Sequence, residues 1–266
     1  WLRNLVTNFD LGTSMVSKGD VTTLIVPRMV NSFWLLLPAT VLTFIIAIPI
    51  GVYSAIRKYS IGDRILTVFS LIGLAIPNFF FAQVLILLIF LTRTFTKDAF
   101  DYNQLLFPVA GMTSGNHLEM SAWGRFWDIM WHMFIPSFVV ATAGMAGFTR
   151  VLRAQMVEYL GSDFIRTAKA KGLGQNSITY KHALRPAIIP FVAGIGGLLP
   201  DLVGGAGLVE VTMSWPGITP TFLEALNSQD IYIVLGLIVI TTLLLMVGNL
   251  LSDLLLAVVD PRIRYN

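Results

Sequence analysis

Long apolar runs constrain this chain more than any other feature. A helix that crosses a bilayer needs about 20 mainly apolar residues. We predict five spans, at about residues 33–56, 65–91, 133–159, 187–209 and 231–259, the third continuing as a helix past Arg150. The sequence therefore predicts an all-α fold, a polytopic bundle of transmembrane helices that makes residues 33–266 one transmembrane domain.

The overall composition excludes a soluble domain. Apolar residues make up 55% of the chain and charged residues only 12%, whereas soluble domains carry about 25% charged residues. The chain has no cysteine, which excludes disulfides and thiolate metal sites. We also expect no nucleic acid among its partners, and membrane lipid as its main surroundings.

The charges of the loops predict the orientation, because cytoplasmic loops are enriched in Lys and Arg. Residues 57–64 carry three cations and one acid, and residues 150–185 carry seven cations and two acids. Residues 92–132 instead have more acids than cations, and the loop after the fourth span has only acids. We therefore place the basic loops and the C-terminus in the cytoplasm.

Residues 1–32 are predicted to form an external segment, since Arg3, Asp10, Lys18, Asp20 and Arg28 make them too polar to span. With five spans and a cytoplasmic C-terminus, residue 1 lies outside the cell. The sequence begins with Trp1 and retains no signal peptide. We therefore expect a sixth, N-terminal span upstream of this numbering.

The basic loop at residues 160–186 is predicted to contain a short helix. Ser162 is a potential N-cap and Asp163 lies in the first turn, while Lys169 and Lys171 lie in the last turn and Gly172 is placed to end it. Phe164, Ile165 and Ala168 share one apolar face, with Arg166 elsewhere around the turn. Such a helix suits docking in the groove of a partner protein.

The fourth span is the best candidate for a translocation path. Glycines and prolines interrupt it, and Asp201 lies within it. A carboxylate at the bilayer centre costs about 2.5–3.5 kcal/mol, so Asp201 either faces a polar path or lies hydrated near the outer interface. Both readings stay open. We include Gly197, Gly204 and Trp215 among the path candidates.

Trp123, Trp127 and Trp131 fall four residues apart on one helical face. We interpret them as part of the outer aromatic belt, with a substrate platform as the alternative.

No catalytic constellation is evident in the sequence. His117, His132 and His182 have no metal-ligand spacing, and no phosphate-binding Walker loop is present. We predict no enzyme activity, no metal and no cofactor in this chain. A pathway without its own energy source, combined with a docking helix, indicates an energy-supplying partner subunit.

The basic loop carries a specific resemblance. Arg166–Gly172, R-T-A-K-A-K-G, followed by H-A-L-R-P at 182–186, resembles the EAA-type motif of ABC importer permeases. Gly172 takes the glycine position and Ala168 the second alanine, whereas Arg166 and Thr167 replace the Glu and the first Ala. The form D-x-x-R-T-A-x-A-K-G, which residues 163–172 follow, is typical of the oligopeptide/dipeptide/nickel branch.

Other stretches resemble the B-type subunit of the same branch in the same order. They are L-P-A-T at 37–40, S-W-P-G at 214–217, D-P-R-I-R at 260–264 and the segment at Asp10–Gly12. The resemblance covers nearly the whole chain, and it implies a six-helix, type I permease of a bacterial or archaeal cytoplasmic membrane.

The resemblance also implies partners and roles. The expected partners are a homologous second permease, two cytoplasmic ATPases that bind ATP and Mg²⁺, and an external substrate-binding lipoprotein that delivers peptide. The expected coupling helix comprises Asp163, Phe164, Ile165, Arg166, Thr167, Ala168, Lys169, Lys171 and Gly172. Alternatives are a nickel or metal-chelate importer of the same branch, an ATP-independent channel or secondary transporter, and a membrane scaffold or receptor.

Overall fold

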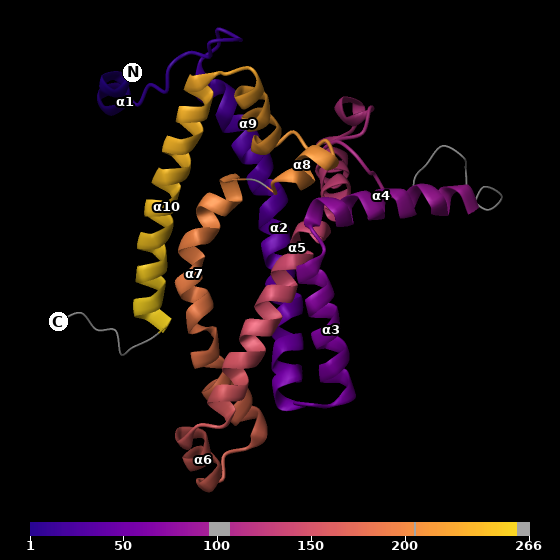
Figure 1. Ribbon diagram of the computed structural model, residues 1–266, viewed down its shortest axis with the longest axis vertical. Helices are drawn as coiled ribbons and strands as arrows, with labels where there is room; N and C mark the ends of the chain where they lie inside the picture. Colours follow the sequence, from indigo (N-terminus) through magenta and orange to yellow (C-terminus); the bar gives the residue numbers. More distant parts are fainter. Residues whose placement is uncertain (96–106, 205, 260–266) are drawn as a thin grey trace. The chain divides into compact units, whose positions relative to one another are not determined.

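The computed structural model describes residues 1–95, 107–204 and 206–259, and every named element in them is helical, which confirms the all-α prediction (Figure 1). The α-helices are α1 (Leu2–Asn8), α2 (Val21–Ile56), α3 (Ile61–Ala75), α4 (Asn78–Phe95), α5 (Ala122–Leu160), α6 (Asp163–Ala170), α7 (Leu184–Gly204), α8 (Leu208–Thr212), α9 (Ile218–Asn227) and α10 (Ile231–Val259). A 3-10 turn, η1 (His117–Glu119), precedes α5, and a π-helix, η2 (Ser177–Ala183), precedes α7.

Two long helices begin earlier than the spans predicted from apolar runs. α2 begins at Val21 rather than at residue 33, and α5 begins at Ala122 rather than at residue 133. The 39 residues of α5 extend about 58 Å at about 1.5 Å per residue, nearly twice the hydrocarbon core of about 30 Å. Hydropathy marks only the part of a helix that lies in lipid, so it missed these polar extensions. Residues 1–32, which were predicted to be external, thus contain α1 and the start of α2.

The second predicted span is broken. Ile76 ends α3 in an extended conformation, with φ −87° and ψ 120°, because the residue before a proline avoids the helical region. By length and composition, α2, α5 and α10 can each span a bilayer, and α3 with α4 would add a fourth span if the broken pair counts as one. The five-span count stays a prediction. By contrast, α7 runs unbroken through Pro190 and its glycines.

The chain divides into two compact units, each with its own apolar core. Unit 1 comprises Trp1–Ala39, Pro77–Val140 and Pro200–Leu244, and unit 2 comprises Thr40–Ile76, Ala141–Leu199 and Leu245–Asn266. One core of unit 1 is formed by Leu11, Val21, Ile25, Ile218, Ala225, Ile233 and Leu237. The core of unit 2, called core 2 below, is formed by Val52, Ala55, Leu152, Met156, Ile165, Ile178, Ala183 and Ala187.

Asp230, directly before α10, fastens the N-terminal segment to the start of that helix within unit 1. Its buried carboxylate accepts hydrogen bonds from the hydroxyl of Ser14 and from the backbone N–H of Val16 and Ile233. Burial by itself raises the pKa of Asp230, but the hydrogen bonds outweigh burial and hold its pKa below the ordinary value. The carboxylate is therefore a structural anchor.

Candidate functional site

The start of α6 differs from its predicted capping. Ser162 occupies the N-cap position, but its hydroxyl donates to the carbonyl oxygen of Tyr159 at 2.5 Å and caps nothing in α6. The carbonyls in the last turn of α5 have no partner within that helix, and the hydroxyl satisfies one of them. Ser162 therefore stabilises the end of α5 and the turn into α6. Asp163, as predicted, lies in the first turn.

The end of α6 confirms the predicted glycine stop. Gly172 adopts φ +77°, and its N–H donates to the carbonyl oxygen of Lys169 at 2.9 Å. The N–H of Leu173 donates to the carbonyl oxygen of Ala168 at 3.3 Å. These two bonds form a Schellman motif, whose left-handed residue is usually glycine. Lys171 lies just beyond the helix, at the C-cap.

This stop gives a first prediction. Gly172→Ala should lower the stability of the α6 segment by about 1 kcal/mol, because alanine is strained in a left-handed conformation. Gly174→Ala is the matched control, since an added methyl group there meets open space and no positive φ is required. Limited proteolysis of the two variants measures the effect. Equal cleavage rates in residues 160–176 would contradict it.

The apolar face of α6 is occupied by the chain itself. Ile165 is 0% exposed and Ala168 is also buried, and Ile165 lies in core 2 with Leu152, Met156 and Ile178. The prediction that Ile165 and Ala168 contact a partner is therefore wrong. The 3.6-residue period identified a buried face, but it did not distinguish a partner from the chain's own α5 and η2. Of the three apolar residues, Phe164 alone is exposed, at 47%.

The outward face of α6 is therefore polar apart from Phe164 and Ala170. Asp163 and Arg166 form an ion pair at 3.2 Å, and their side chains are 94% and 76% exposed. An exposed pair of this kind contributes little to stability. The remaining exposed residues of this face are Thr167, Lys169, Ala170 and Lys171. In Figure 1, α6 (salmon) follows the end of α5 and precedes the start of α7.

A π-helix that the sequence did not reveal leads from the α6 segment into α7. It spans Ser177–Ala183, and its residues Ile178 and Ala183 lie in core 2. The hydroxyl of Thr179 is buried there without a hydrogen-bond partner. π-helical turns are rare and often occur at functional sites. No periodic sequence signal distinguishes such a turn from an ordinary helix.

The proposed path residues do not form a site in the part that the structure describes. Trp215 is fully buried beside Leu35 and Met133, and its indole N–H donates to the carbonyl oxygen of Asn31 at 2.9 Å. Trp215 is therefore a core residue, and the prediction that it lines the path is wrong. Gly197 is half-buried in α7. The side chains of Asp201 and Gly204 lie outside the described residues.

Glu210 in α8 is a fully buried carboxylate that the sequence analysis read only as a loop acid. The hydroxyl of Ser32 donates to Oε1 at 2.6 Å and the backbone N–H of Thr219 to Oε2 at 2.9 Å. The N–H of Ala206 donates to Oε1 at 3.3 Å, and Gly217 passes so close that a Cβ there would collide with the carboxylate. Glu210 thereby fixes the S-W-P-G segment to α2.

Two of the three histidines converge on one carboxylate in unit 1. Nδ1 of His117 lies 2.7 Å from Oδ2 of Asp128, and Nδ1 of His132 lies 3.3 Å from Oδ1. The hydroxyl of Ser114 donates to the same carboxylate at 2.6 Å. Through Asp128, the contacts of Ser114 and His117 hold the loop before α5 against that helix. Among the described side chains, no group of three His, Asp or Glu residues is arranged to hold a metal ion.

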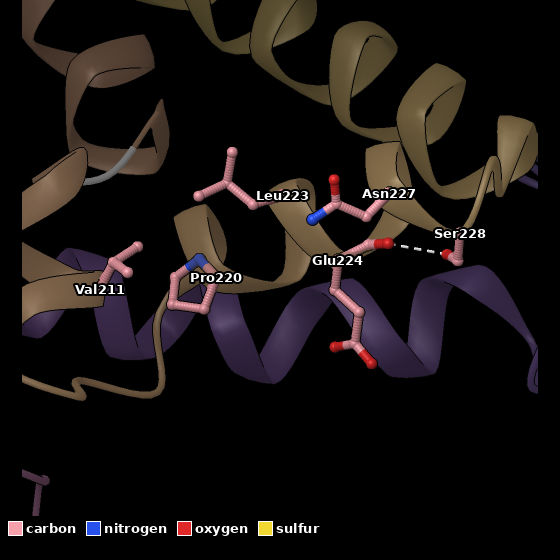
Figure 2. Close-up of a pocket in the computed structure, with 6 residues that line it drawn as sticks. All are labelled: Val211, Pro220, Leu223, Glu224, Asn227 and Ser228. Carbon is pink, nitrogen blue, oxygen red and sulfur yellow. Dashed lines mark hydrogen bonds between the residues drawn. The ribbon is translucent and has the colours of Figure 1, made fainter.

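A shallow groove of about 600 Å³ lies over α8 and α9 (Figure 2). Val211, Pro220 and Leu223 give it an apolar floor. Figure 2 shows the Glu224 carboxylate pointing away from the Asn227 amide. Substrate sites bring their polar groups together over a common space, so this open groove does not qualify as one.

Comparison with known proteins decides the family. The model of the family described as "Binding-protein-dependent transport system inner membrane component" matches residues 47–265. The chain belongs to this family. The permease is 41% identical over 266 residues to the oligopeptide transport system permease protein AppB of Bacillus subtilis, covering 100% of this chain and 79% of the relative.

Two further relatives extend the comparison. The permease is 34% identical over 264 residues to the dipeptide transport system permease protein DppB of Escherichia coli K12, covering 96% of this chain and 77% of the relative. It is 35% identical over 269 residues to the oligopeptide transport system permease protein OppB of Mycobacterium tuberculosis H37Rv, covering 99% and 78%. The resemblance found in the sequence is thereby confirmed. Together with its apolar helices, family membership makes the permease a multi-pass membrane protein and one subunit of a transport complex.

Proposed function

We propose that the chain is the membrane permease subunit of an ATP-driven importer of oligopeptides or dipeptides, in which α6 is the coupling helix. The observation that carries this proposal is similarity to oligopeptide and dipeptide transport permeases over nearly the whole chain. ATP and Mg²⁺ bind to two partner ATPases, and this chain hydrolyses nothing itself. A second permease completes the path, and an external binding protein supplies the peptide.

The geometry of α6 supports the coupling role. Ile165 on its inner face is buried in core 2, and the Schellman motif ends the helix at its C-terminus. Its outer face offers Phe164, one aromatic anchor, among charged residues. Aromatic anchors within a polar rim are typical of energetically important interface residues. A rigid helix of this kind transmits a displacement because it cannot yield independently of α5.

Orientation completes the mechanism. The excess of Lys and Arg in the basic loops supports a cytoplasmic α6 and an external residue 1, in the cytoplasmic membrane of a bacterium or archaeon. Closure of the ATPases on ATP displaces α6, and α5 and α7 carry that displacement along their length. The path then opens alternately to the two sides. Membrane lipid surrounds the apolar helices.

The test uses the complete transporter in proteoliposomes, with the binding protein and a radiolabelled dipeptide. Phe164→Asp combined with Arg166→Glu should reduce uptake by at least about tenfold, because hot-spot truncations cost about 2 kcal/mol or more. The variant should fold normally but co-purify poorly with the ATPases. Arg3→Glu, an exposed charge reversal on the predicted outer side, is the control. Wild-type uptake and ATPase association in the α6 variant would overturn the coupling role.

The same vesicles distinguish the alternatives. Uptake without ATPase subunits would indicate a channel or secondary transporter. Uptake of chelated Ni²⁺ but not dipeptide would indicate the nickel importer, and binding without uptake would indicate a receptor.

A further inference from the structure

A bidentate ion pair joins α3 to α5 in unit 2. Nε of Arg153 lies 2.7 Å from Oδ1 of Asp63, and Nη2 lies 2.8 Å from Oδ2. Asp63 is only 2% exposed. The fork of the guanidinium matches both carboxylate oxygens, which fixes orientation as well as distance. Neither residue belongs to the short sequence motifs that carried the resemblance.

The same carboxylate also closes the turn between α2 and α3, which consists of residues 57–60. The backbone N–H of Tyr59 donates to Oδ2 of Asp63 at 2.8 Å. In return, the N–H of Asp63 donates to the hydroxyl of Ser60 at 3.2 Å, which caps α3. Asp63 therefore holds the turn on one side and α5 on the other. A movement of α5 at Arg153 acts directly on this turn.

Arg153 lies beside the residues that support α6. Its neighbour Leu152 and Met156, one turn further on, belong to core 2 together with Ile165 of α6. The end of α2 enters the same core through Val52 and Ala55. α2 and α5 approach closely here, since a Cβ on Gly51 would lie 3.0 Å from the Leu152 side chain.

We propose that Asp63 and Arg153 are positioning residues that make the α2–α3 hairpin move with α5 when α6 is displaced. This inference rests on the proposed coupling role of α6. Apolar contacts in core 2 are non-directional, so by themselves they hold α2 against α5 without fixing the register between the two helices. The ion pair removes that freedom because two parallel hydrogen bonds fix the register.

The test separates coupling from folding. Arg153→Met leaves the buried Asp63 carboxylate without its cationic partner and should lower the amount of folded protein. Adding Asp63→Asn removes the unpaired negative charge and keeps an oxygen that accepts from the N–H of Tyr59. The double variant should therefore regain the wild-type amount of folded protein. In the complete transporter, the double variant should still bind the ATPases and hydrolyse ATP. Its dipeptide uptake per ATP should fall by at least about fivefold, the low end of typical coupling between sites.

Controls and contrary results are available on the same helix. Arg150→Met removes an exposed arginine one turn earlier on α5 and should leave uptake per ATP unchanged. Arg153→Lys should give an intermediate ratio, because lysine cannot form the bidentate contact. If the double variant takes up as much dipeptide per ATP as the wild type, the positioning role is wrong and the ion pair only stabilises the packing of α3 against α5.

A spectroscopic readout follows from the absence of cysteine in the chain. Spin labels at Arg57→Cys and Glu158→Cys, both exposed positions, report the distance between the turn and the end of α5. We expect one narrow distance with and without ATP in the otherwise unmodified chain, and an ATP-dependent change in the double variant. A distance that changes equally in both would contradict the proposal. Failure of the α6 variant test would instead reject the coupling role itself, so the two failures are distinguishable.

Discussion

Ile165→Asp should abolish transport and destabilise the permease even in the absence of any partner. Ile165 is completely buried in core 2. Removal of a buried isoleucine side chain costs about 2–5 kcal/mol, and an unpaired buried charge adds several more. Since native proteins are stable by only about 5–15 kcal/mol, α6 should detach from α5 and η2. Thermal unfolding of the purified chain in detergent measures this.

The matched comparison for Ile165 is its neighbour. Phe164→Asp introduces the same charge at an exposed position of the same turn, so it should leave the unfolding temperature of the isolated chain nearly unchanged while weakening ATPase association. Ile165→Val, which removes one methyl group, should cost about 0.5–1.5 kcal/mol. If Ile165 instead contacted a partner, Ile165→Asp would leave the isolated chain as stable as the wild type.

The sequence predicted the limits of α6 because its signals are local. Gly172 ends the helix through backbone hydrogen bonds, and Asp163 lies in the first turn, where the helix dipole favours a negative charge. The continuity of α5 past Arg150 was predicted for the same reason. The contacts of the inner face of α6 could not be predicted. A helical period identifies an apolar stripe, but it does not show whether the chain itself or a partner protein buries that stripe.

Long-range contacts were beyond prediction for a different reason. Ser32 and Glu210 lie 178 residues apart, and Asp63 and Arg153 lie 90 apart. In the sequence, Glu210 was one acid in an acidic loop and Asp63 one acid in a basic one. Trp215 was included among the path candidates, but it is completely buried in unit 1. Only the fold brings each acid to its donors.

Glu210→Ala should strongly disrupt unit 1 around α8 and the S-W-P-G segment. The change leaves the hydroxyl of Ser32 and the N–H groups of Ala206 and Thr219 without their acceptor. Each buried donor left unpaired costs about 1–3 kcal/mol, and the lost side chain also leaves a cavity. We expect a large fall in the unfolding temperature in detergent and a large increase in proteolysis near Trp215, because the S-W-P-G segment loses its attachment to α2.

The neighbouring helix provides the control for Glu210. Glu224→Ala removes the same carboxylate from an exposed position of α9 and should change stability by less than about 0.5 kcal/mol. Gly217→Ala should also destabilise, because its methyl group would meet the pinned Glu210 carboxylate. That effect should shrink in a Glu210→Asp background, whose shorter side chain withdraws from the new methyl group. Additive effects of the two substitutions would show that the carboxylate does not hold the S-W-P-G segment, because residues in direct contact are coupled.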